Sequence, residues 1–280
     1  MGSGNSSFAG KLLKGAYLRV KSIGKNPFSQ TGLSWWDVKE VKHLKEQGHY
    51  TKKIFDRPVQ FNSPHEFLHS IDEIFIKEIY KIDLPKNPFI LDCGANLGFS
   101  VIYFKRKYPD AELIAFEPDE YNFPLLQKNI NSFHFEGVEL RKEAVWKENT
   151  TLNFSSEGSM ASRIDDSGEN GSGNGRVKAV RLRDFLSRKV DLLKIDIEGA
   201  EYEVLKDIQD RLNMVDNLFF EYHGTFQQAP ELIDSLKILN EAGFSFYIRE
   251  ATEVYKTPFS RDKSSLMHYD IQLNVYCFRT

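Results

Sequence analysis

Short apolar runs alternate with amphipathic stretches over the C-terminal two thirds of this 280-residue chain. Runs of strand length lie at 89–93 and 112–117, and each is followed by a stretch with apolar residues three or four positions apart. The same alternation returns at Leu192–Asp196 and Leu218–Tyr222. Parallel strands that are buried on both faces give such unbroken apolar runs, with helices between them. The pattern therefore predicts a doubly wound α/β fold with a mostly parallel sheet.

The remaining elements complete the predicted sheet. We expect a third strand at about 138–145, helices at 98–108, at Phe123–Ile130, from Ala200 and over Pro230–Ala242, and two final strands at Phe244–Arg249 and Ile271–Phe278. The last two runs are expected to pair antiparallel at one end of the sheet.

Two regions depart from this alternation. Residues 1–60 precede a strong helix start, in which Ser63 is the expected cap and Pro64 the first helical residue. We predict a basic helical extension over 1–60 and one catalytic domain over 61–280. Residues 146–191 form an insertion with strand-like ends and a Gly- and Ser-rich centre. An insertion of this kind is typical of a lid or a specificity element.

Charge is spread unevenly along the chain. Residues 1–60 hold eleven Lys and Arg against four Asp and Glu, which leaves the rest of the chain acidic. A basic helix expected over Phe8–Ile23 either packs on the body with a solvated face, which we favour, or makes peripheral contact with a membrane. The acidic body argues against nucleic acid as a partner, because phosphate requires a basic groove. Nothing in the sequence indicates an oligomeric state.

The cysteines and the hydropathy pattern bear on the compartment. Only two cysteines occur, Cys93 at the end of the first strand and Cys277 on the last, so we expect no disulfide and a reducing cytoplasm. No apolar run reaches the length that crosses a bilayer, and no secretory signal precedes the first strand.

The first strand ends in a turn that reads Asp92-Cys-Gly-Ala-Asn-Leu-Gly98, and the second strand ends on Glu117. Glycines let the backbone approach a ligand, and a carboxylate on the next strand accepts hydrogen bonds from ribose hydroxyls. The carboxylate of Asp92 would repel a diphosphate but suits a cation. We therefore predict S-adenosylmethionine as cofactor and S-adenosylhomocysteine as its product, with a nicotinamide dinucleotide as the alternative. The expected cofactor-binding residues are Asp92, Gly94, Ala95, Asn96, Gly98, Glu117 and Pro118, with Glu143 and Ala144 beside the adenine.

The segment Lys194-Ile-Asp-Ile-Glu-Gly-Ala-Glu201 is the second strong signal. Asp196 and Glu198 point the same way from a strand end, where they could hold the methionine amino group, deprotonate the acceptor or bind a divalent ion. Methyl transfer to a hydroxyl needs a base, and His223 is our first candidate and Glu198 our second. We predict no metal ligand, with a Mg²⁺ site built from Asp196, Glu198 or Glu221 as the alternative.

Together these motifs resemble the FkbM family of methyltransferases over about residues 60–280. The resemblance implies a Rossmann-like, seven-stranded fold with an antiparallel last strand, and S-adenosylmethionine-dependent O-methylation of a sugar or glycan, a natural product or another hydroxyl or carboxyl acceptor. Donor contacts in the glycine turn and at Glu117, and active-site roles for Asp196 and Glu198, are implied as well. One departure is Arg183, where the family tends to have Asp, and it leaves the acceptor class open.

Two other functions are consistent with a nucleoside site in this fold. One is a nicotinamide-dependent oxidoreductase, which the turn disfavours. The other is a non-catalytic binding or scaffold protein, which the intact acids Asp196 and Glu198 disfavour. The sequence therefore favours a cytoplasmic O-methyltransferase that acts on a small-molecule or glycan hydroxyl.

Overall fold

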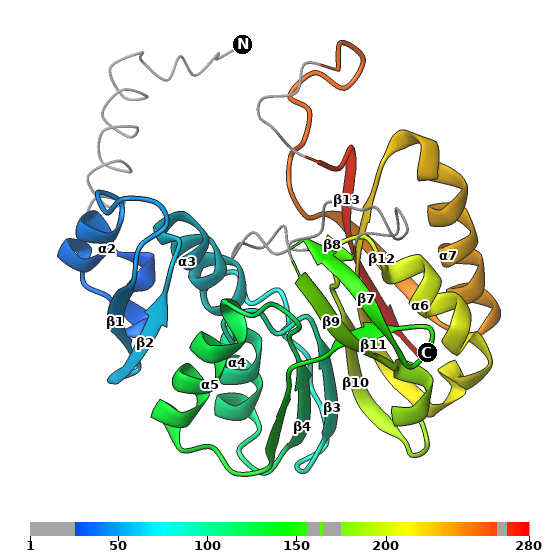
Figure 1. The fold of residues 1–280 in the computed structure, drawn as a ribbon, viewed down its shortest axis with the longest axis horizontal. Helices are drawn as coiled ribbons and strands as arrows, with labels where there is room; N and C mark the ends of the chain where they lie inside the picture. Colours follow the sequence, from blue (N-terminus) through cyan, green and yellow to red (C-terminus); the bar gives the residue numbers. More distant parts are fainter. Residues whose placement is uncertain (1–25, 156–162, 165–174, 262–267, 280) are drawn as a thin grey trace, which may run out of the picture.

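The computed structural model describes residues 26–155, 163–164, 175–261 and 268–279, which surround a central seven-stranded sheet (Figure 1). The helices and turns of helix are η1 (Pro27–Thr31), α2 (Trp35–Val41), α3 (Pro64–Ile71), η2 (Asp72–Ile76), α4 (Phe99–Lys107), α5 (Asn122–Phe133), η3 (Leu182–Phe185), α6 (Glu201–Ile208), η4 (Gln209–Met214), η5 (Phe226–Gln228) and α7 (Ala229–Glu241). The strands are β1 (Tyr50–Ile54), β2 (Arg57–Phe61), β3 (Phe89–Cys93), β4 (Glu112–Phe116), β5 (Val138–Arg141), β6 (Ala144–Trp146), β7 (Thr150–Ser155), β8 (Arg163–Ile164), β9 (Gly175–Arg181), β10 (Val190–Ile195), β11 (Val215–Gly224), β12 (Ser245–Glu250) and β13 (Ile271–Phe278).

The central sheet has the strand order β12-β13-β11-β10-β3-β4-β5. Strands β5, β4, β3, β10 and β11 are parallel, and β13 is antiparallel to both of its neighbours. This is the predicted Rossmann-like sheet with an antiparallel last strand, and the fold class is confirmed. The carboxyl ends of the parallel strands meet along one edge, which is where such sheets bind their ligands.

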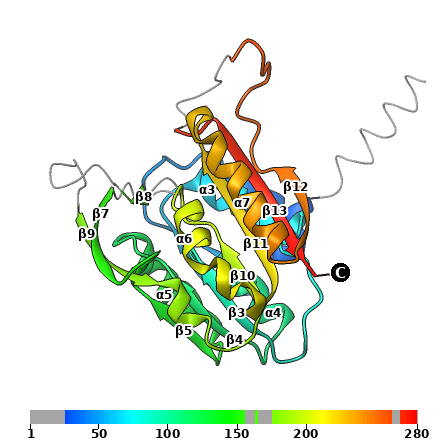
Figure 2. The ribbon, with the colours of Figure 1, turned by 90° about the vertical axis from the view of Figure 1, so that its right-hand side faces the viewer.

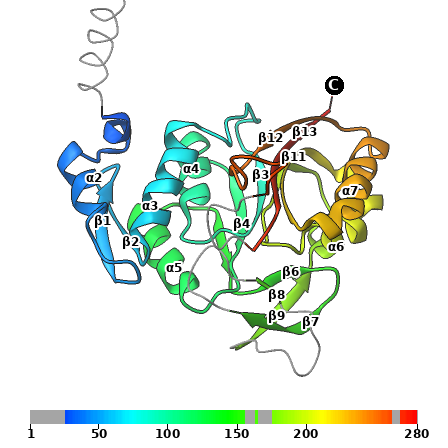
Figure 3. The same ribbon diagram turned by 90° about the horizontal axis from the view of Figure 1, so that it is seen from above.

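Helices cover both faces of this sheet (Figure 3). Helices α3, α4 and α5 lie on one face, and α6 and α7 lie on the other, in front of β10 and β11 in Figure 2. Alternate strand residues enter two separate cores: Ile90 packs in one, and Phe89 and Leu91 pack in the other. Burial on both faces explains why the strands appear in the sequence as unbroken apolar runs.

The third strand is shorter than predicted. The prediction of a single strand at 138–145 is wrong. Strand β5 ends at Arg141, and the chain enters a second sheet as β6 from Ala144. The neighbouring strand β4 also ends here, and Pro118 follows it without a backbone N–H to extend the ladder. The break turns residues 142–144 across the carboxyl edge of the sheet.

Part of the insertion forms that second sheet, whose order is β6-β9-β7-β8. The strand-like ends predicted at Thr151–Phe154 and Val177–Leu182 correspond to β7 and β9, which pair antiparallel. The Gly- and Ser-rich centre predicted as a loop lies outside the described residues, apart from its last glycine.

The N-terminal part contains an antiparallel hairpin, β1 and β2, which we did not predict. The extension also contains helix α2, which begins at Trp35, and the helix expected at Phe8–Ile23 lies outside the described residues. The buried side chain of Asn129 on α5 accepts a hydrogen bond from the backbone N–H of Gln60 at 2.7 Å and donates to its carbonyl at 3.0 Å. The hairpin therefore packs on the body and shares its core.

Helix α3 begins as predicted, with Ser63 as its cap and Pro64 at its first position. Both cysteines are buried and free. Within the part of the chain that the structure describes, no helix is both long and apolar enough to cross a membrane.

Candidate active site

A cavity of about 620 Å³ lies at the carboxyl edge of the central sheet. Its wall is formed by α3 and η2 on one side and by the segment that enters β6 on another. Polar side chains reach it from the ends of β3, β4, β10 and β11, from β13, and from α3 and η2. Of the predicted site residues, those that line the cavity are Gly94, Ala95, Asn96, Glu117, Pro118, Glu143, Ala144, Asp196, Glu198 and His223.

Asp92 and Gly98 do not line the cavity. Asp92 is fully buried beneath it, where its carboxylate accepts a hydrogen bond from Ser100 Oγ at 2.5 Å and pairs with Lys194 Nζ at 3.3 Å. Gly98 has a left-handed φ of +89°, and a Cβ there would lie 2.6 Å from Leu126 Cδ1. Gly98 therefore lets the turn pack on α5, and Asp92 supports the site from below.

Lys194 connects the two loops that flank the site. Its buried ammonium donates to the carbonyl of Gly94 at 2.8 Å and pairs with Asp196 Oδ2 at 3.2 Å. Although burial opposes its charge, Asp196 and Asp92 raise the pKa of Lys194 well above its usual value. Gly94 also has a positive φ of +93°, and a Cβ there would meet the carbonyl oxygen of Asp196 at 1.8 Å. The glycine turn (residues 94–98) and the acidic loop (residues 196–199) are thus in contact through their backbones, at a separation that only glycine allows.

Glu117 lies at the end of β4 with its carboxylate beside the glycine turn. One oxygen accepts the backbone N–H of Asn96 at 2.8 Å, and the other accepts that of Asp119 at 2.9 Å. Burial raises the pKa of Glu117 to about 7, against the opposing effect of these two backbone hydrogen bonds. Each carboxylate oxygen has room for a further donor, since a carboxylate offers about four acceptor positions.

Glu143 is held by two basic side chains. Arg141 Nε donates to one oxygen at 2.6 Å, and Lys178 Nζ donates to the other. Although burial acts in the opposite direction, the hydrogen bonds from Arg141 and Lys178 hold the pKa of Glu143 below its usual value. The carboxylate is therefore charged, and it stands at the cavity wall beside Ala144.

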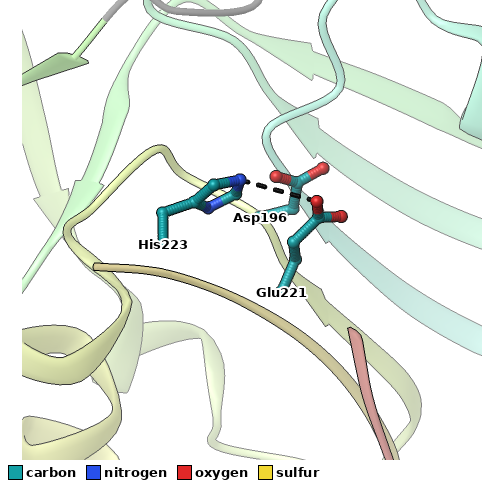
Figure 4. A group of neighbouring side chains, drawn as sticks. All are labelled: Asp196, Glu221 and His223. Atoms are coloured by element: carbon teal, nitrogen blue, oxygen red, sulfur yellow. Dashed lines mark ion pairs between the residues drawn. The ribbon is translucent and has the colours of Figure 1, made fainter. Parts of the chain in front are cut away.

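His223 stands among acidic side chains at the end of β11, as Figure 4 shows for two of them. Its Nδ1 lies 3.0 Å from Glu201 Oε1, and its Nε2 lies 3.5 Å from Glu221 Oε1 and 3.7 Å from Glu198 Oε2. Glu201 also accepts the backbone N–H groups of Ile197 and Gly199, so it is fixed in place. This contact to Glu201 directs Nε2 toward the cavity.

The acidic cluster around His223 consists of Asp196, Glu198, Glu201 and Glu221. It shifts the pKa values of several of these side chains and of His223. Burial raises the pKa of Glu198 to about 8, and it also raises that of Glu221 together with the charge of Asp196. Burial alone would lower the pKa of His223, but the carboxylates of Glu198 and Glu201 raise it well above its usual value. Several acidic side chains therefore compete for one imidazole, and a cationic ligand would favour their ionised forms.

Three of these side chains also form the arrangement that a metal ion could use. Asp196, Glu221 and His223 each present a ligand atom within 4.8 Å of the others, and they are the one such group found among the described residues. Two oxygens and one nitrogen suit a divalent cation. Asp196 and His223 already have partners within the protein, in Lys194 and Glu201.

Several residues of the site were absent from the sequence prediction. Glu201 was not among the predicted site residues, and its contact to His223 depends on how α6 packs against β11. His65 and His69 lie four apart on α3, line the cavity and stack with ring centroids 6.4 Å apart. Their spacing is one that zinc ligands use on helices, and it could have been noticed in the sequence. The metal-ligand group among the described residues does not include them.

Comparison with known proteins identifies the family of this chain. The model of the Methyltransferase FkbM domain matches residues 92–246. Methyltransferase 1 of Beauveria bassiana is 31% identical over 199 residues, which cover 61% of this chain and 79% of that protein. Methyltransferase sdnD of Sordaria araneosa is 30% identical over 186 residues, which cover 53% of this chain and 72% of that protein.

A solved structure of an FkbM methyltransferase from Methylobacillus flagellatus shares 16% identity with a TM-score of 0.47. The match covers 70% of this chain and 45% of that one. The family match extends from the glycine turn into β12 and includes Glu117, Asp196 and His223. The chain is a methyltransferase and belongs to the FkbM methyltransferase family.

Proposed function

We propose that this chain is an S-adenosylmethionine-dependent O-methyltransferase that methylates a hydroxyl of a sugar, a glycan or a small natural product. The observation that carries the proposal is that one cavity holds both Glu117 and the imidazole of His223. Glu117 is suited to a ribose, and His223 is suited to a hydroxyl proton. Donor and acceptor would therefore lie along the same edge of the sheet.

In this proposal the donor's adenosine lies over the glycine turn. Glu117 would accept the two ribose hydroxyls, and Glu143 beside Ala144 would meet the adenine amine. The methionine ammonium and the sulfonium would point toward Asp196 and Glu198, where negative charge is in excess. Asp92 serves this site indirectly, because it holds Lys194 and Lys194 holds the Gly94 carbonyl.

His223 would remove the proton of the acceptor hydroxyl. S-adenosylmethionine, when bound, would supply an activated methyl group for the acceptor oxygen and would leave as S-adenosylhomocysteine with the carbon–sulfur bonding pair, while the hydroxyl proton would pass to Nε2. An adjacent positive sulfonium opposes a protonated imidazole, so donor binding would lower the pKa of His223 and free Nε2. Glu201, which holds Nδ1 at 3.0 Å, would stabilise the imidazolium that forms.

Replacing His223 with Asn tests this role. We expect kcat with a hydroxyl acceptor to fall by about 10²–10⁴, since that is the contribution of a positioned base. The dissociation constant of S-adenosylhomocysteine, measured by calorimetry, should change little. An unchanged kcat in His223→Asn would move the base role to Glu198, and Glu198→Gln would then be the inactive variant.

The ligands that the protein binds distinguish this proposal from the two other functions. A nicotinamide-dependent oxidoreductase would bind NADPH and enhance its fluorescence, which we do not expect, because the buried acids around Lys194 repel a diphosphate. A non-catalytic binding protein would bind S-adenosylhomocysteine but transfer no methyl group to any hydroxyl of an acceptor panel. Methyl transfer with no response to NADPH supports the proposal against both.

A chelator decides the question of a metal. The proposal assigns the chemistry to His223, so activity should survive exhaustive treatment with a chelator. Loss of activity with recovery on Mg²⁺ would instead assign Asp196, Glu221 and His223 to a cation that polarises the acceptor oxygen.

The remaining expectations concern partners and compartment. We propose a cytoplasmic location, which the two buried free thiols support because oxidising compartments favour disulfides. A small-molecule or glycan acceptor stays the proposed partner, and nucleic acid is not proposed. Peripheral membrane contact through the basic segment before residue 26 stays the alternative, and vesicle sedimentation would test it.

A further inference from the structure

Asn274 on β13 has an unusual environment. Its side chain is 2% exposed and lines the cavity, yet its Oδ1 has no hydrogen-bond partner among the residues that the structure describes. A buried amide oxygen without a donor is unfavourable, and native proteins rarely retain one without a reason. Among the described residues, five buried side-chain atoms have no hydrogen-bond partner, and Asn274 Oδ1 is the one whose residue lines the cavity.

The strand register places Asn274 beside the acidic cluster. In the antiparallel pair of β11 and β13, Asn274 is opposite Glu221, and Gln272 is opposite His223. Side chains of opposed residues lie side by side on the same face of a sheet. Asn274 and Gln272 therefore extend the row of Glu221 and His223 by one strand, and all four line the cavity.

The order of strands determines how far this row of side chains lies from Glu117. From Glu117, at the end of β4, the sheet continues through β3, β10 and β11 to β13. With strands about 4.8 Å apart, Asn274 lies roughly 19 Å from the ribose end and about one strand spacing from Glu221. The donor occupies the first part of this path in the proposed function. The acceptor then occupies the part between His223 and β13.

We propose that Asn274 selects acceptors with a second hydroxyl beside the hydroxyl that receives the methyl group, that is, vicinal diols such as those of a sugar ring. The inference rests on the proposed function and narrows its substrate class. One hydroxyl lies at His223 Nε2, and its neighbour donates a hydrogen bond to Asn274 Oδ1. The amide also offers N–H donors, so a diol satisfies it in either orientation of the side chain.

The same geometry excludes carboxylate acceptors. In the side-chain orientation of the structure, an ionised carboxylate has no proton to donate to Asn274 Oδ1. It would also be placed beside Asp196, Glu198 and Glu221, where like charges repel. A neutral hydroxylated acceptor meets both conditions.

The test uses methyl hexopyranosides and the monodeoxy analogue of each, with methyl transfer measured from labelled S-adenosylmethionine. In the wild-type protein, kcat/KM should be at least about 10-fold higher for the diol than for the analogue that lacks the neighbouring hydroxyl. In Asn274→Leu, kcat/KM for the diol should fall about 10–100-fold and that for the deoxy analogue should stay within about two-fold. The affinity for S-adenosylhomocysteine should not change.

Stability separates this role from a structural one. Asn274→Leu removes an unpartnered buried polar atom, so its Tm should equal or exceed that of the wild type while its activity falls. Tyr276→Phe is the matched control, because Tyr276 has an unpartnered buried hydroxyl on the same strand but does not line the cavity. It should leave both kcat/KM values unchanged.

Each contrary result has a distinct meaning. Equal losses on diol and deoxy acceptors in Asn274→Leu, or a wild-type protein that does not discriminate between them, overturn the selection of a diol. Binding of S-adenosylhomocysteine with no transfer to any pyranoside of the panel overturns the inference and leaves the donor site intact. Absence of both binding and transfer contradicts the proposed function itself.

Discussion

Lys194 shows how one buried side chain fixes the geometry of the site. It is 2% exposed and pairs with two carboxylates while it holds the carbonyl of the glycine turn. Removing one partner of a buried ionic network leaves charges without compensation. We expect Lys194→Met to lower the free energy of unfolding by about 3–5 kcal/mol in urea titrations.

Lys178 is the control for this prediction. Its side chain is 70% exposed in its pair with Glu143, and exposed pairs contribute at most about 1 kcal/mol. The double variant Lys194→Met/Asp92→Asn should recover part of the loss, because it removes one of the two unpaired charges. Equal stabilities of Lys194→Met and Lys178→Met would show that the buried network does not support the fold.

At the scale of elements, the strand ends bring the chemistry together. Glu117, Asp196 and His223, which the sequence predicted as site residues, all line the cavity, because the carboxyl ends of parallel strands meet at one edge. It did not predict Asn274, since a residue on the antiparallel strand reaches this edge only through its register with β11. It also placed Asp92 in the cavity, although Ser100 and Lys194 hold that carboxylate below it.

Asn129 joins three elements that are distant in the sequence. Its fully buried amide bonds to both backbone groups of Gln60 in β2 and donates to the carbonyl of Leu97 in the glycine turn at 2.9 Å. Asn129→Ala leaves these buried groups unpaired, and we expect a loss of about 2–4 kcal/mol in the free energy of unfolding. Lys128→Ala on the exposed side of the same helix should change it by less than about 1 kcal/mol.

Hydrogen exchange would locate that effect. Amide protection should decrease in β2 and in the glycine turn of Asn129→Ala, and it should stay high in β10 and β11. Unchanged protection in β2 would mean that the hairpin is held by apolar packing alone. That packing is present as well, because Val59 and Phe61 are buried in the same core as α5.

At the scale of the whole molecule, the sequence predicted the strands of the central sheet far better than the N-terminal hairpin that packs against it. Apolar runs and their spacing are local signals, so the parallel strands were predicted to within a few residues, with β5 as the exception. The hairpin at residues 50–61 carries weaker signals, because its strands are short and three consecutive polar residues, Thr51–Lys53, break the alternation typical of a half-buried strand. Its existence depends on packing against α5, which no local pattern indicates.

The buried acids also give the molecule a pH dependence. The pKa of Glu117 rises from 4.5 to about 7 and that of Glu198 from 4.5 to about 8, and that of His223 is raised as well. Groups whose pKa is higher in the folded protein stabilise it at low pH and lose this effect as the pH rises through the folded value. The Tm of the ligand-free protein should therefore fall by about 4–8 °C between about pH 5 and pH 8.

Ligand binding should oppose that trend. S-adenosylhomocysteine brings an ammonium group and ribose hydroxyls to the ionised acids, so the increase in Tm that it causes should be larger at the upper end of this range. A Tm that rises with pH over the same range would contradict the assignment of these acids as buried and uncompensated.

The most direct test of the whole account is calorimetry of S-adenosylhomocysteine binding to three proteins: the wild type, Glu117→Ala and Glu112→Ala. Glu112 begins the strand that Glu117 follows, is exposed and lies at the opposite end from the cavity. We predict saturable binding to the wild type, affinity lower by about 10–100-fold in Glu117→Ala and unchanged affinity in Glu112→Ala. Absence of binding to the wild type, or equal affinity in all three, would contradict a donor site at the end of β4.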